Sequence, residues 1–386
     1  MGNCCKKKSR NQSELIESLF EDKEDNPLSV KLCSSDFEKI SLLGRGSFGE
    51  VFLVKNKRND KYYAMKILNK GAVKLRHQEI HTKAERDLMV KIHCPFIVGI
   101  KFAFQDQEKL YIITEYMQGG EIFYHLHKER KFNNEKTKFY ISEIVLALEF
   151  LHNKHMLYRD LKPENILLDS EGHIKLTDFG LSKIFNKKKE KAYTICGTPQ
   201  YLAPEILSDD GYDDCIDWWS LGCVMYEMLV GRAPFNIPRG GSLCADLYKK
   251  KVFMPTYVSK EAIDLISLLL VPNPKKRLGY GPNGASKIKE HEFFEGVNWD
   301  DVYNKKVKPP FVPELNGETD LRYFDIAFTS EKIEGSQDKN SLDDAGFNVS
   351  NDSENTPSND YKGFTYVTSS IANEMINLDG SGSTGQ

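Results

Sequence analysis

The sequence predicts an α+β fold of two lobes, a small β-rich N-terminal lobe and a larger helical lobe. Short apolar runs of strand type alternate with one helical stretch between residues 37 and 117. From Asn134, the expected N-cap, apolar residues recur at helical spacing. The segment from Cys215 to Gly231 is apolar nearly all round, which is typical of a helix buried in the centre of a lobe. A chain of 386 residues holds one such domain of roughly 260 residues with flanking segments, and no second large domain.

Composition and charge narrow the class of protein. The formal net charge of −3 at pH 7 argues against a general electrostatic affinity for nucleic acid. No apolar run approaches the roughly 20 residues of a membrane-spanning helix, and the N-terminus has no signal-peptide core, so we expect a cytoplasmic protein. The 8 cysteines show no metal-ligand spacing, and a chain of this size needs no disulfides, so we expect reduced thiols.

The strongest functional signal is a polar run in the middle of the chain, Tyr158-Arg159-Asp160-Leu161-Lys162-Pro163-Glu164-Asn165, followed by Asp178-Phe179-Gly180. Asp160 can receive the proton of an attacking hydroxyl, and Lys162 can neutralise charge on a phosphoryl group in transfer. Asn165 and Asp178 can hold Mg²⁺ against the phosphates of ATP. An isolated Arg-Asp or Asp-Phe-Gly is usually a turn or a helix cap. At this spacing and in this order, the set predicts phosphoryl transfer.

A glycine-rich segment supplies a candidate nucleotide site: Gly44, Arg45, Gly46, Ser47, Phe48, Gly49, Glu50 and Val51. It lies between strand-like runs, Phe37–Leu43 and Val51–Lys55, which predicts the tip of a hairpin. The glycines alone would also suit a dinucleotide-binding unit, but no helical pattern follows Gly49. The next strand carries Lys66, and Glu85 on the helical stretch 81–92 can pair with it.

These motifs resemble those of protein kinases, and several further segments resemble the AGC family. The segments are His81-Thr82-Lys83-Ala84-Glu85, Thr194-Ile195-Cys196-Gly197-Thr198-Pro199, Pro309-Pro310-Phe311-Val312-Pro313, Tyr323-Phe324-Asp325 and Gly363-Phe364-Thr365-Tyr366. The resemblance spans about residues 37–367 and implies a bilobal kinase fold, serine/threonine protein kinase activity, and ATP and Mg²⁺ as cofactors. It divides the chain into an N-terminal segment (1–36), a kinase domain (37–294, lobes 37–117 and 118–294), a C-terminal tail (295–370) and a flexible end (371–386).

Within the AGC family the tail resembles those of protein kinase B, ribosomal S6 kinase and serum/glucocorticoid-regulated kinase. Protein kinase B would carry a lipid-binding domain before the kinase domain, and 36 residues are too few to build one. The resemblance implies nucleotide contacts from Leu43, the glycine-rich segment, Ala64, Lys66, Thr114 as gatekeeper, Glu115, Met117, Glu121, Leu167 and Phe324 of the tail.

The resemblance also implies a preference for substrates with Arg upstream of the target Ser or Thr. Glu121, Glu164 and Glu227 would meet these arginines, since carboxylates pair strongly with guanidinium groups in a partly dry cleft. The alternative is that these are solvated surface glutamates. Thr198 would touch the substrate and Asp160. Gln200 departs from the usual Glu, which weakens the case for a more distant basic contact. Two structural roles are expected from Glu205, which should pair with Arg277, and from Asp217, which should brace the catalytic loop.

The first ten residues are typical of a compact membrane anchor. Gly2 is a candidate for myristoylation and Cys4 and Cys5 for palmitoylation, while the basic run 6–10 can meet an anionic membrane surface. Lys6 departs from the myristoylation pattern, so a plain basic tail is the alternative.

Two threonines are candidate sites for activating phosphorylation by upstream kinases. Phosphate on Thr194 would pair with His81, Arg159 and Lys183 and order the segment around it. Phosphate on Thr365 would favour docking of Tyr361 and Phe364 in a hydrophobic groove beside the helix that carries Glu85. Thr356 is a weaker second candidate. The alternative is a tail that serves as a degradation or binding tag.

Two rival functions remain at the level of sequence. A pseudokinase that binds ATP as a signalling scaffold would keep the fold without catalysis, but every catalytic position here is occupied. A small-molecule kinase would lack the peptide-seating segment Ala203-Pro204-Glu205 and the acidic groove.

Overall fold

The computed structural model describes residues 32–46, 49–75, 79–185, 190–235, 252–333, 361, 363–372 and 374. These residues fall into two compact units. The sheet unit contains the described residues of 25–86, 100–116 and 324–386, and the helical unit contains those of 87–99 and 117–323. The sequence predicts a small lobe over residues 37–117, whereas Met117 and residues 87–99 group with the helices in the structure. The tail is divided between the units after Tyr323.

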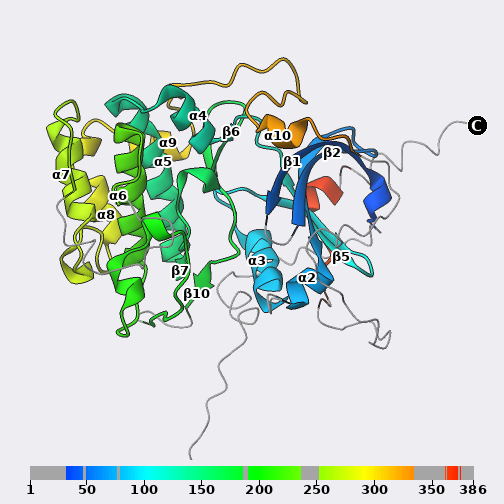
Figure 1. Ribbon diagram of the computed structural model, residues 1–386, viewed down its shortest axis with the longest axis horizontal. Coiled ribbons are helices and arrows are strands. Elements are labelled where there is room, and N and C mark those ends of the chain that lie inside the picture. Colours follow the sequence, from blue (N-terminus) through cyan, green and yellow to red (C-terminus); the bar gives the residue numbers. More distant parts are fainter. Residues whose placement is uncertain are drawn as a thin grey trace, which may run out of the picture. The chain divides into compact units, whose positions relative to one another are not determined.

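The sheet unit is built on six antiparallel strands in the order β1-β2-β3-β5-β4-β11. Figure 1 shows the first two of them, β1 and β2, side by side. The strands are β1 (Phe37–Gly46), β2 (Gly49–Asn56), β3 (Tyr62–Asn69), β4 (Ile100–Gln105), β5 (Lys109–Glu115) and β11 (Tyr366–Val367). The first two confirm the predicted hairpin around the glycine-rich segment. β11 comes from the far end of the chain and forms one edge of the sheet.

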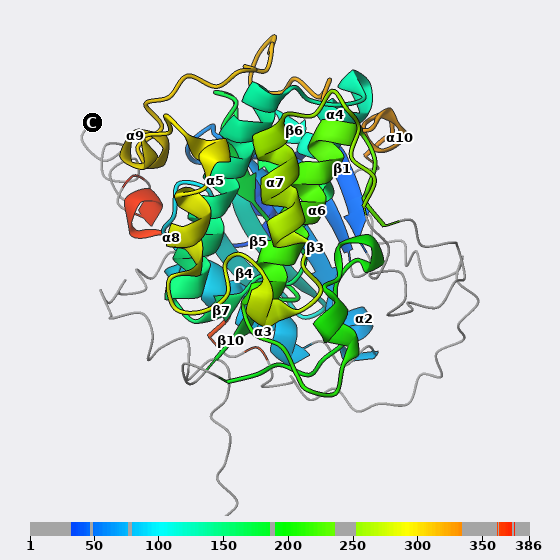
Figure 2. The same cartoon turned by 90° about the vertical axis from the view of Figure 1, so that its left-hand side faces the viewer.

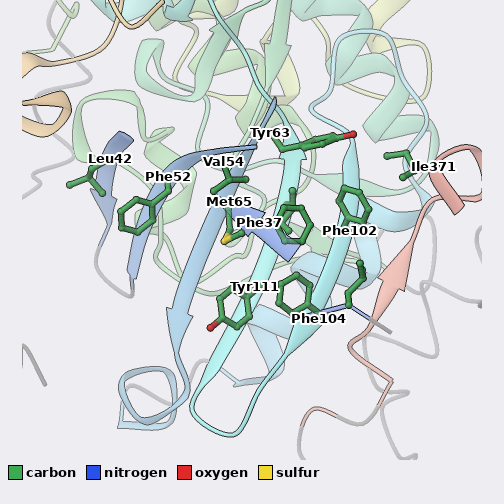
Figure 3. Close-up of a cluster of buried hydrophobic side chains, with 12 residues drawn as sticks. Phe37, Leu42, Phe52, Val54, Tyr63, Met65, Phe102, Phe104, Tyr111 and Ile371 are labelled. Atoms are coloured by element: carbon green, nitrogen blue, oxygen red, sulfur yellow. The ribbon is translucent and has the colours of Figure 1, made fainter. Parts of the chain in front are cut away.

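One face of this sheet carries a cluster of buried apolar side chains (Figure 3). Because side chains alternate between the faces of a strand, the residues that β2 and β4 contribute to the cluster are two apart in sequence. In β1, register shifts interrupt this alternation, and Phe37 and Leu42 both reach the cluster. Phe102 and Phe104 of β4 illustrate the alternation, and Ala103 between them lies on the other face. Phe104 stacks on Tyr111 with ring centroids 4.6 Å apart, while Phe102 meets Phe37 edge to face. The cluster therefore fixes the register of the whole sheet.

The helices of the sheet unit are short, apart from the one that carries Glu85. They are α2 (Lys70–Leu75), α3 (Glu79–Lys91) and, in the tail, α10 (Ile326–Thr329). α3 begins two residues earlier than the sequence predicted and runs across the boundary between the units. Asp325 caps α10 by accepting a hydrogen bond from the Ala327 amide, and α10 lies beside β1 (Figure 1).

The helical unit centres on α5 (Asn134–Asn153), α6 (Cys215–Val230) and α7 (Lys260–Leu269), which pack side by side (Figure 2). The smaller helices α4 (Ile122–Glu129), α8 (Gly284–Lys289) and α9 (Trp299–Tyr303) surround them. α6 is buried along nearly its whole length and ends at Gly231, whose φ of 83° needs no strain in a glycine. The helical prediction for α5 is confirmed, but its N-cap is wrong by one residue: Asn133, not Asn134, accepts the hydrogen bond from the Lys136 amide.

Two small sheets hold the predicted catalytic segments in the helical unit. β6 (Gly120–Glu121), β8 (Ile166–Leu168) and β9 (Ile174–Leu176) form one, and β7 (Met156–Leu157) pairs with β10 (Lys183–Ile184) in the other. The polar run 158–165 therefore leaves β7 and enters β8, and the segment that begins at Asp178 leaves β9 and enters β10. Short strands at both ends of each segment fix where its polar residues lie.

The first part of the tail packs on the helical unit through aromatic rings. His125 of α4 is buried, and its ring centroid lies 4.8 Å from that of Phe311 and 4.9 Å from that of Tyr323. Gly120 has a φ of 67°, and a side chain there would come within 2.4 Å of the Tyr323 carbonyl oxygen. The glycine thus permits the close approach of the tail backbone.

A buried ion pair joins two distant parts of the helical unit. Arg277 donates to both carboxylate oxygens of Glu205, at 2.6 and 2.8 Å, so the predicted pair is present. The same guanidinium donates to the Cys215 and Val271 carbonyls and lies over the ring of Trp219.

Among the described residues the cysteines are free thiols, and none of the helices there is long and apolar enough to cross a bilayer.

Candidate active site

The predicted catalytic side chains of the helical unit meet around Asp160. Its carboxylate accepts hydrogen bonds from Thr198 Oγ1 at 2.8 Å and from Asn165 Nδ2 at 2.9 Å, and Lys162 Nζ lies 3.0 Å away. Lys162 also donates to Thr198 Oγ1 at 3.0 Å. Asp160 is only 7% exposed. A buried, oriented carboxylate next to a lysine is suited to hold a hydroxyl and take its proton.

The backbone of this segment is held by Asp217, as expected. The fully buried Asp217 carboxylate accepts from the amides of Tyr158 (3.0 Å) and Arg159 (2.9 Å) and lies 2.8 Å from His152 Nε2. Burial opposes the charged imidazolium, but the hydrogen bond and the charge of Asp217 outweigh it and raise the pKa of His152. Arg159 adopts φ = 71°, a strained conformation for a residue with a side chain, which the contacts with Asp217 help to maintain.

Asn165 and Asp178 supply the oxygen atoms expected of a Mg²⁺ site. The Asn165 amide nitrogen donates to the carbonyl and to the carboxylate of Asp160, so its amide oxygen is directed away from these acceptors. Asp178, two residues after the end of β9, adopts φ = 57°. A carboxylate and an amide oxygen are ligands that Mg²⁺ prefers.

In the sheet unit, four of the predicted nucleotide residues share the face opposite the apolar cluster: Val51, Ala64, Lys66 and Thr114. Lys66 pairs in register with Val51, and Ala64 with Thr114, whereas their neighbours Met65 and Ile113 belong to the cluster. Lys66 Nζ lies 3.0 Å from Glu85 Oε1 of α3, and Glu85 is nearly buried. The lysine-glutamate pair expected from the sequence is therefore formed.

The glycines of the hairpin serve two purposes. A side chain on Gly49 would lie 1.7 Å from the Ile67 carbonyl oxygen, so the sheet itself requires a glycine there. No described atom lies within 4 Å of the side-chain position of Gly44, and only the Gly49 carbonyl oxygen, 3.9 Å away, comes near that of Gly46. Protein packing does not explain these two glycines, but close approach of a ligand phosphate would. Ser47 and Phe48 at the tip lie outside the described residues.

Arg45 of the hairpin makes contacts that the sequence did not predict. Its guanidinium donates from Nε to Glu50 at 2.9 Å and, through both terminal nitrogens, to the carboxylate of Glu331 at 2.7 Å each. The glycine-rich hairpin is thus joined to the tail segment that follows α10. A nucleotide contact of the Arg45 side chain would have to compete with these two carboxylates.

The remaining predicted nucleotide contacts are distributed over both units. Leu43 and Glu115 are half-buried in the sheet unit, where Phe324 stacks on Tyr116 with centroids 5.7 Å apart. The helical unit contains Met117, Glu121 and Leu167, and the last two are paired between β6 and β8.

The three predicted substrate glutamates differ in exposure. Glu227 is buried and accepts a hydrogen bond from the Tyr201 hydroxyl at 2.6 Å, while Glu164 is half-buried and Glu121 is exposed. Burial and the neighbouring charge of Glu164 raise the pKa of Glu227, although the Tyr201 hydrogen bond opposes this. A buried carboxylate of this kind is not an ordinary surface glutamate.

The segment around Thr194 is anchored by Tyr212. Ala192 and Tyr212 exchange two backbone hydrogen bonds, and the Tyr212 hydroxyl donates to the Thr194 carbonyl at 2.6 Å. Arg159 Nη1 donates to the same hydroxyl at 3.1 Å. The Thr194 side chain is exposed. Of the other predicted phosphate partners, Lys183 lies in β10 opposite Leu157, and the side chain of His81 is outside the described residues, as is the basic run 187–189.

The aromatic cluster of the tail is docked in the sheet unit. Tyr361 is 3% exposed and Phe364 is fully buried. Arg86 of α3, next to Glu85, donates to the Gly363 carbonyl and lies over the Phe364 ring, and Gln105 donates to the Tyr361 carbonyl at 2.7 Å. Thr365 is exposed. Gly2, Cys4, Cys5 and Thr356 lie outside the described residues.

Sequence reasoning missed several residues that organise these sites: His152, Tyr212, Arg86 and Glu331. Each acts through a contact with a residue distant in sequence, and no local motif or periodicity marks His152, Tyr212 or Glu331. Only Arg86 had an available signal, since it follows Glu85 directly on a helix beside the proposed groove.

Comparisons with known proteins agree with this geometry. The family model of the protein kinase domain matches residues 37–294. The human RAC-beta serine/threonine-protein kinase is 45% identical over 304 residues, covering 79% of this chain and 63% of the relative. The mouse protein of that name is 44% identical over 308 residues (80% and 64%), and the Xenopus laevis RAC-beta serine/threonine-protein kinase A is 44% identical over 303 residues (78% and 62%). The chain thus corresponds to less than two thirds of the length of these relatives. The match of the family model over residues 37–294 shows that the chain belongs to the protein kinase family.

Proposed function

We propose that the chain is a serine/threonine protein kinase that transfers the γ-phosphoryl group of Mg·ATP to protein hydroxyls with Arg upstream. The observation that carries this proposal is the network around Asp160, where Thr198, Lys162 and Asn165 all contact one carboxylate. Such a network orients a base before the substrate arrives, which is where much of the catalytic advantage of an enzyme originates.

The residues of the network have distinct roles in the proposed reaction. Asp160 accepts the proton of the substrate hydroxyl, and Thr198 holds the carboxylate in place from the substrate side. Lys162, which touches both, stabilises the negative charge that develops on the transferred group. Lys66, held by Glu85, neutralises the phosphates that remain with the nucleotide.

Mg·ATP supplies the reactive phosphoryl group, and two features of this chain fit it. Asn165 and Asp178 offer an amide and a carboxylate oxygen to the metal, and the space beside Gly44 is open to phosphate. Among the described residues, no cluster of three or more His, Cys, Asp or Glu side chains would hold a metal by itself. A metal that enters with the nucleotide is consistent with a site of two protein ligands.

Basic-directed substrate choice is supported by Glu164 and Glu227. Glu227 is buried beside Glu164, and two neighbouring carboxylates of which one is desolvated favour a cation. A guanidinium fits better than an ammonium because it binds two carboxylate oxygens at once. Glu121 is exposed and would add a second, more solvated contact.

A peptide array tests the proposal directly. The purified full chain is incubated with Mg·ATP on arrayed Ser, Thr and Tyr peptides, and Asp178→Ala protein serves as the inactive control. We expect phosphate only on Ser and Thr, with Arg preferred upstream over Lys at matched positions. Binding of ATP without phosphate on any peptide would contradict the proposal and favour a signalling scaffold.

We expect Thr194→Ala to lower the peptide kinase activity of phosphorylated protein at least about tenfold, because one lost charge-assisted hydrogen bond contributes ~1.5–3 kcal/mol. Tyr212 already positions the Thr194 backbone near Arg159, so a phosphate there would add to an existing contact. Ile195→Ala, a change at an exposed neighbour, is the control. Activity of the Thr194→Ala protein equal to that of the control would rule out this switch.

A second phosphorylation site at Thr365 is proposed on the tail. Phosphate there would lie one residue from Phe364, whose ring contacts Arg86 on the helix of Glu85. Docking of the tail and formation of the Lys66–Glu85 pair would then favour each other. Upstream kinases that modify Thr194 and Thr365 are the implied partners.

We also propose that the chain acts in the cytoplasm and at an anionic membrane surface, through acylation of Gly2, Cys4 and Cys5. Stable anchoring needs two signals, because one myristoyl chain binds only marginally. Gly2→Ala is expected to move the protein to the soluble fraction, measured by fractionation of cells. Cys33→Ser, a change at an exposed cysteine, is the control, and membrane retention of Gly2→Ala protein would contradict the proposal.

A further inference from the structure

The face of the six-stranded sheet that carries the apolar cluster lies opposite the predicted nucleotide residues. Met65 belongs to the cluster and Lys66 to the other face, and the same alternation separates Ile113 from Thr114. Any segment that packs on the cluster is therefore separated from Lys66 by the sheet itself.

Segments outside the matched kinase domain cover this face. The cluster includes Leu32 before the domain and Ile371 after it, and Phe328 and Val367 of the tail pack against it. Figure 3 shows Ile371 reaching from the C-terminal segment toward Phe102 of β4. Ile371 is 7% and Ala372 1% exposed. The sequence predicts a flexible end from residue 371, and the burial of Ile371 and Ala372 differs from that prediction.

The last described residues are held by a sequence of specific contacts. β11 pairs with β4 through Tyr366 opposite Ala103 and Val367 opposite Phe102, and the Thr368 amide donates to the Lys101 carbonyl at 3.0 Å. A helical turn follows, in which the amides of Ile371 and Ala372 donate to the Thr368 carbonyl. Glu374 closes the segment with an ion pair to Lys61 at 2.8 Å.

The geometry points to a second docking site on this face, for an extended strand followed by an Ile-Ala-x-Glu helical turn. We infer that its occupancy by residues 366–374 keeps the aromatic segment Tyr361–Phe364 docked when Thr365 carries no phosphate. The docking itself does not depend on the proposed kinase function. Only its role in regulation rests on that function. Phosphorylation of Thr365 would then adjust an already docked tail rather than recruit a free one.

Two observations support the inference that the tail stays docked without phosphate on Thr365. Among the described residues, the aromatic segment is held by hydrogen bonds from Arg86 and Gln105 to main-chain carbonyls, by cations over the Tyr361 and Phe364 rings, and by burial of these rings. The Thr365 side chain, by contrast, is exposed. The two docked segments are also joined through the single residue Thr365, so that binding of one holds the other at high effective concentration.

The test measures hydrogen–deuterium exchange of residues 361–367 in the full chain carrying Thr365→Ala, without ATP or substrate. We expect exchange within about twofold of the parent chain for Thr365→Ala alone, and at least about tenfold faster exchange once Ile371→Asp is added. Ser370→Asp places the same charge on the exposed neighbour and should have no such effect.

Loss of protection in Thr365→Ala protein alone would overturn the inference, because the phosphate would then be what holds the segment. Unchanged exchange after Ile371→Asp would also overturn the inference, since the contacts of residues 361–364 with Arg86 and Gln105 would then be enough to hold the aromatic segment. If Ile371→Asp also exposes the amides of α5 and α6, the milder Glu374→Lys decides: it should raise exchange in 361–367, and Lys61→Glu should restore protection. This test uses no kinase assay. A negative result would therefore not contradict the proposed kinase activity, and absence of that activity would not contradict this inference.

Discussion

Changing Asp160 to Asn is expected to lower the rate of peptide phosphorylation by about 10²–10⁴-fold, the usual contribution of a general base. The amide has the shape of the carboxylate and can still accept the hydrogen bond of Thr198, so the loss should appear in kcat more than in the KM for ATP. Steady-state kinetics of the phosphorylated protein measures both constants.

The control for this substitution is Asp209→Asn, which removes the same charge from an exposed position of the same unit. Thermal unfolding of both variants should match that of the parent chain. A kcat within tenfold of the parent would mean that Asp160 is not the base, even if the chain is a kinase.

The second large effect concerns stability: Arg277→Ala should lower the free energy of unfolding by about 3–5 kcal/mol. The change leaves the buried Glu205 carboxylate without its cation, and it also removes the donors to the Cys215 and Val271 carbonyls. An uncompensated buried charge is far more costly than the pair itself is favourable. Denaturant unfolding measures the difference.

Lys276→Ala is the matched control, because it removes a charge from the exposed neighbour and should change stability by less than about 0.5 kcal/mol. The double variant Glu205→Leu/Arg277→Met should be more stable than Arg277→Ala, since it leaves no charge unpaired. Equal stability of Arg277→Ala and the control would show that the pair contributes nothing.

Much of the fold follows from local patterns in the sequence. The periodic apolar residues of α5 and the continuous apolar run of α6 predict helices, and both are buried as their patterns require. The polar run from Tyr158 to Asn165 was located by order and spacing, and the structure brings its side chains together around Asp160.

Contacts between distant segments could not be predicted in the same way. Arg45 and Glu331 are 286 residues apart, and each alone reads as an ordinary surface charge. Tyr212 reaches Arg159 only because the chain between them folds back, which no periodicity encodes. Ile371 stands in a Ser- and Asn-rich stretch, where composition favours a solvated chain, and only the apolar sheet face explains its burial. Local composition decides a segment's conformation when no partner surface competes for it.

β11 has a consequence for how copies of the chain behave toward one another. It covers the outer edge of β4, where unpaired main-chain N–H and C=O groups would otherwise be presented to solvent. At only two residues, β11 is too short to recruit a further strand. A protease that removed the end of the chain would uncover the β4 edge next to Phe102 and Phe104. Copies of the clipped protein would then be prone to pair through their exposed β4 edges and to aggregate.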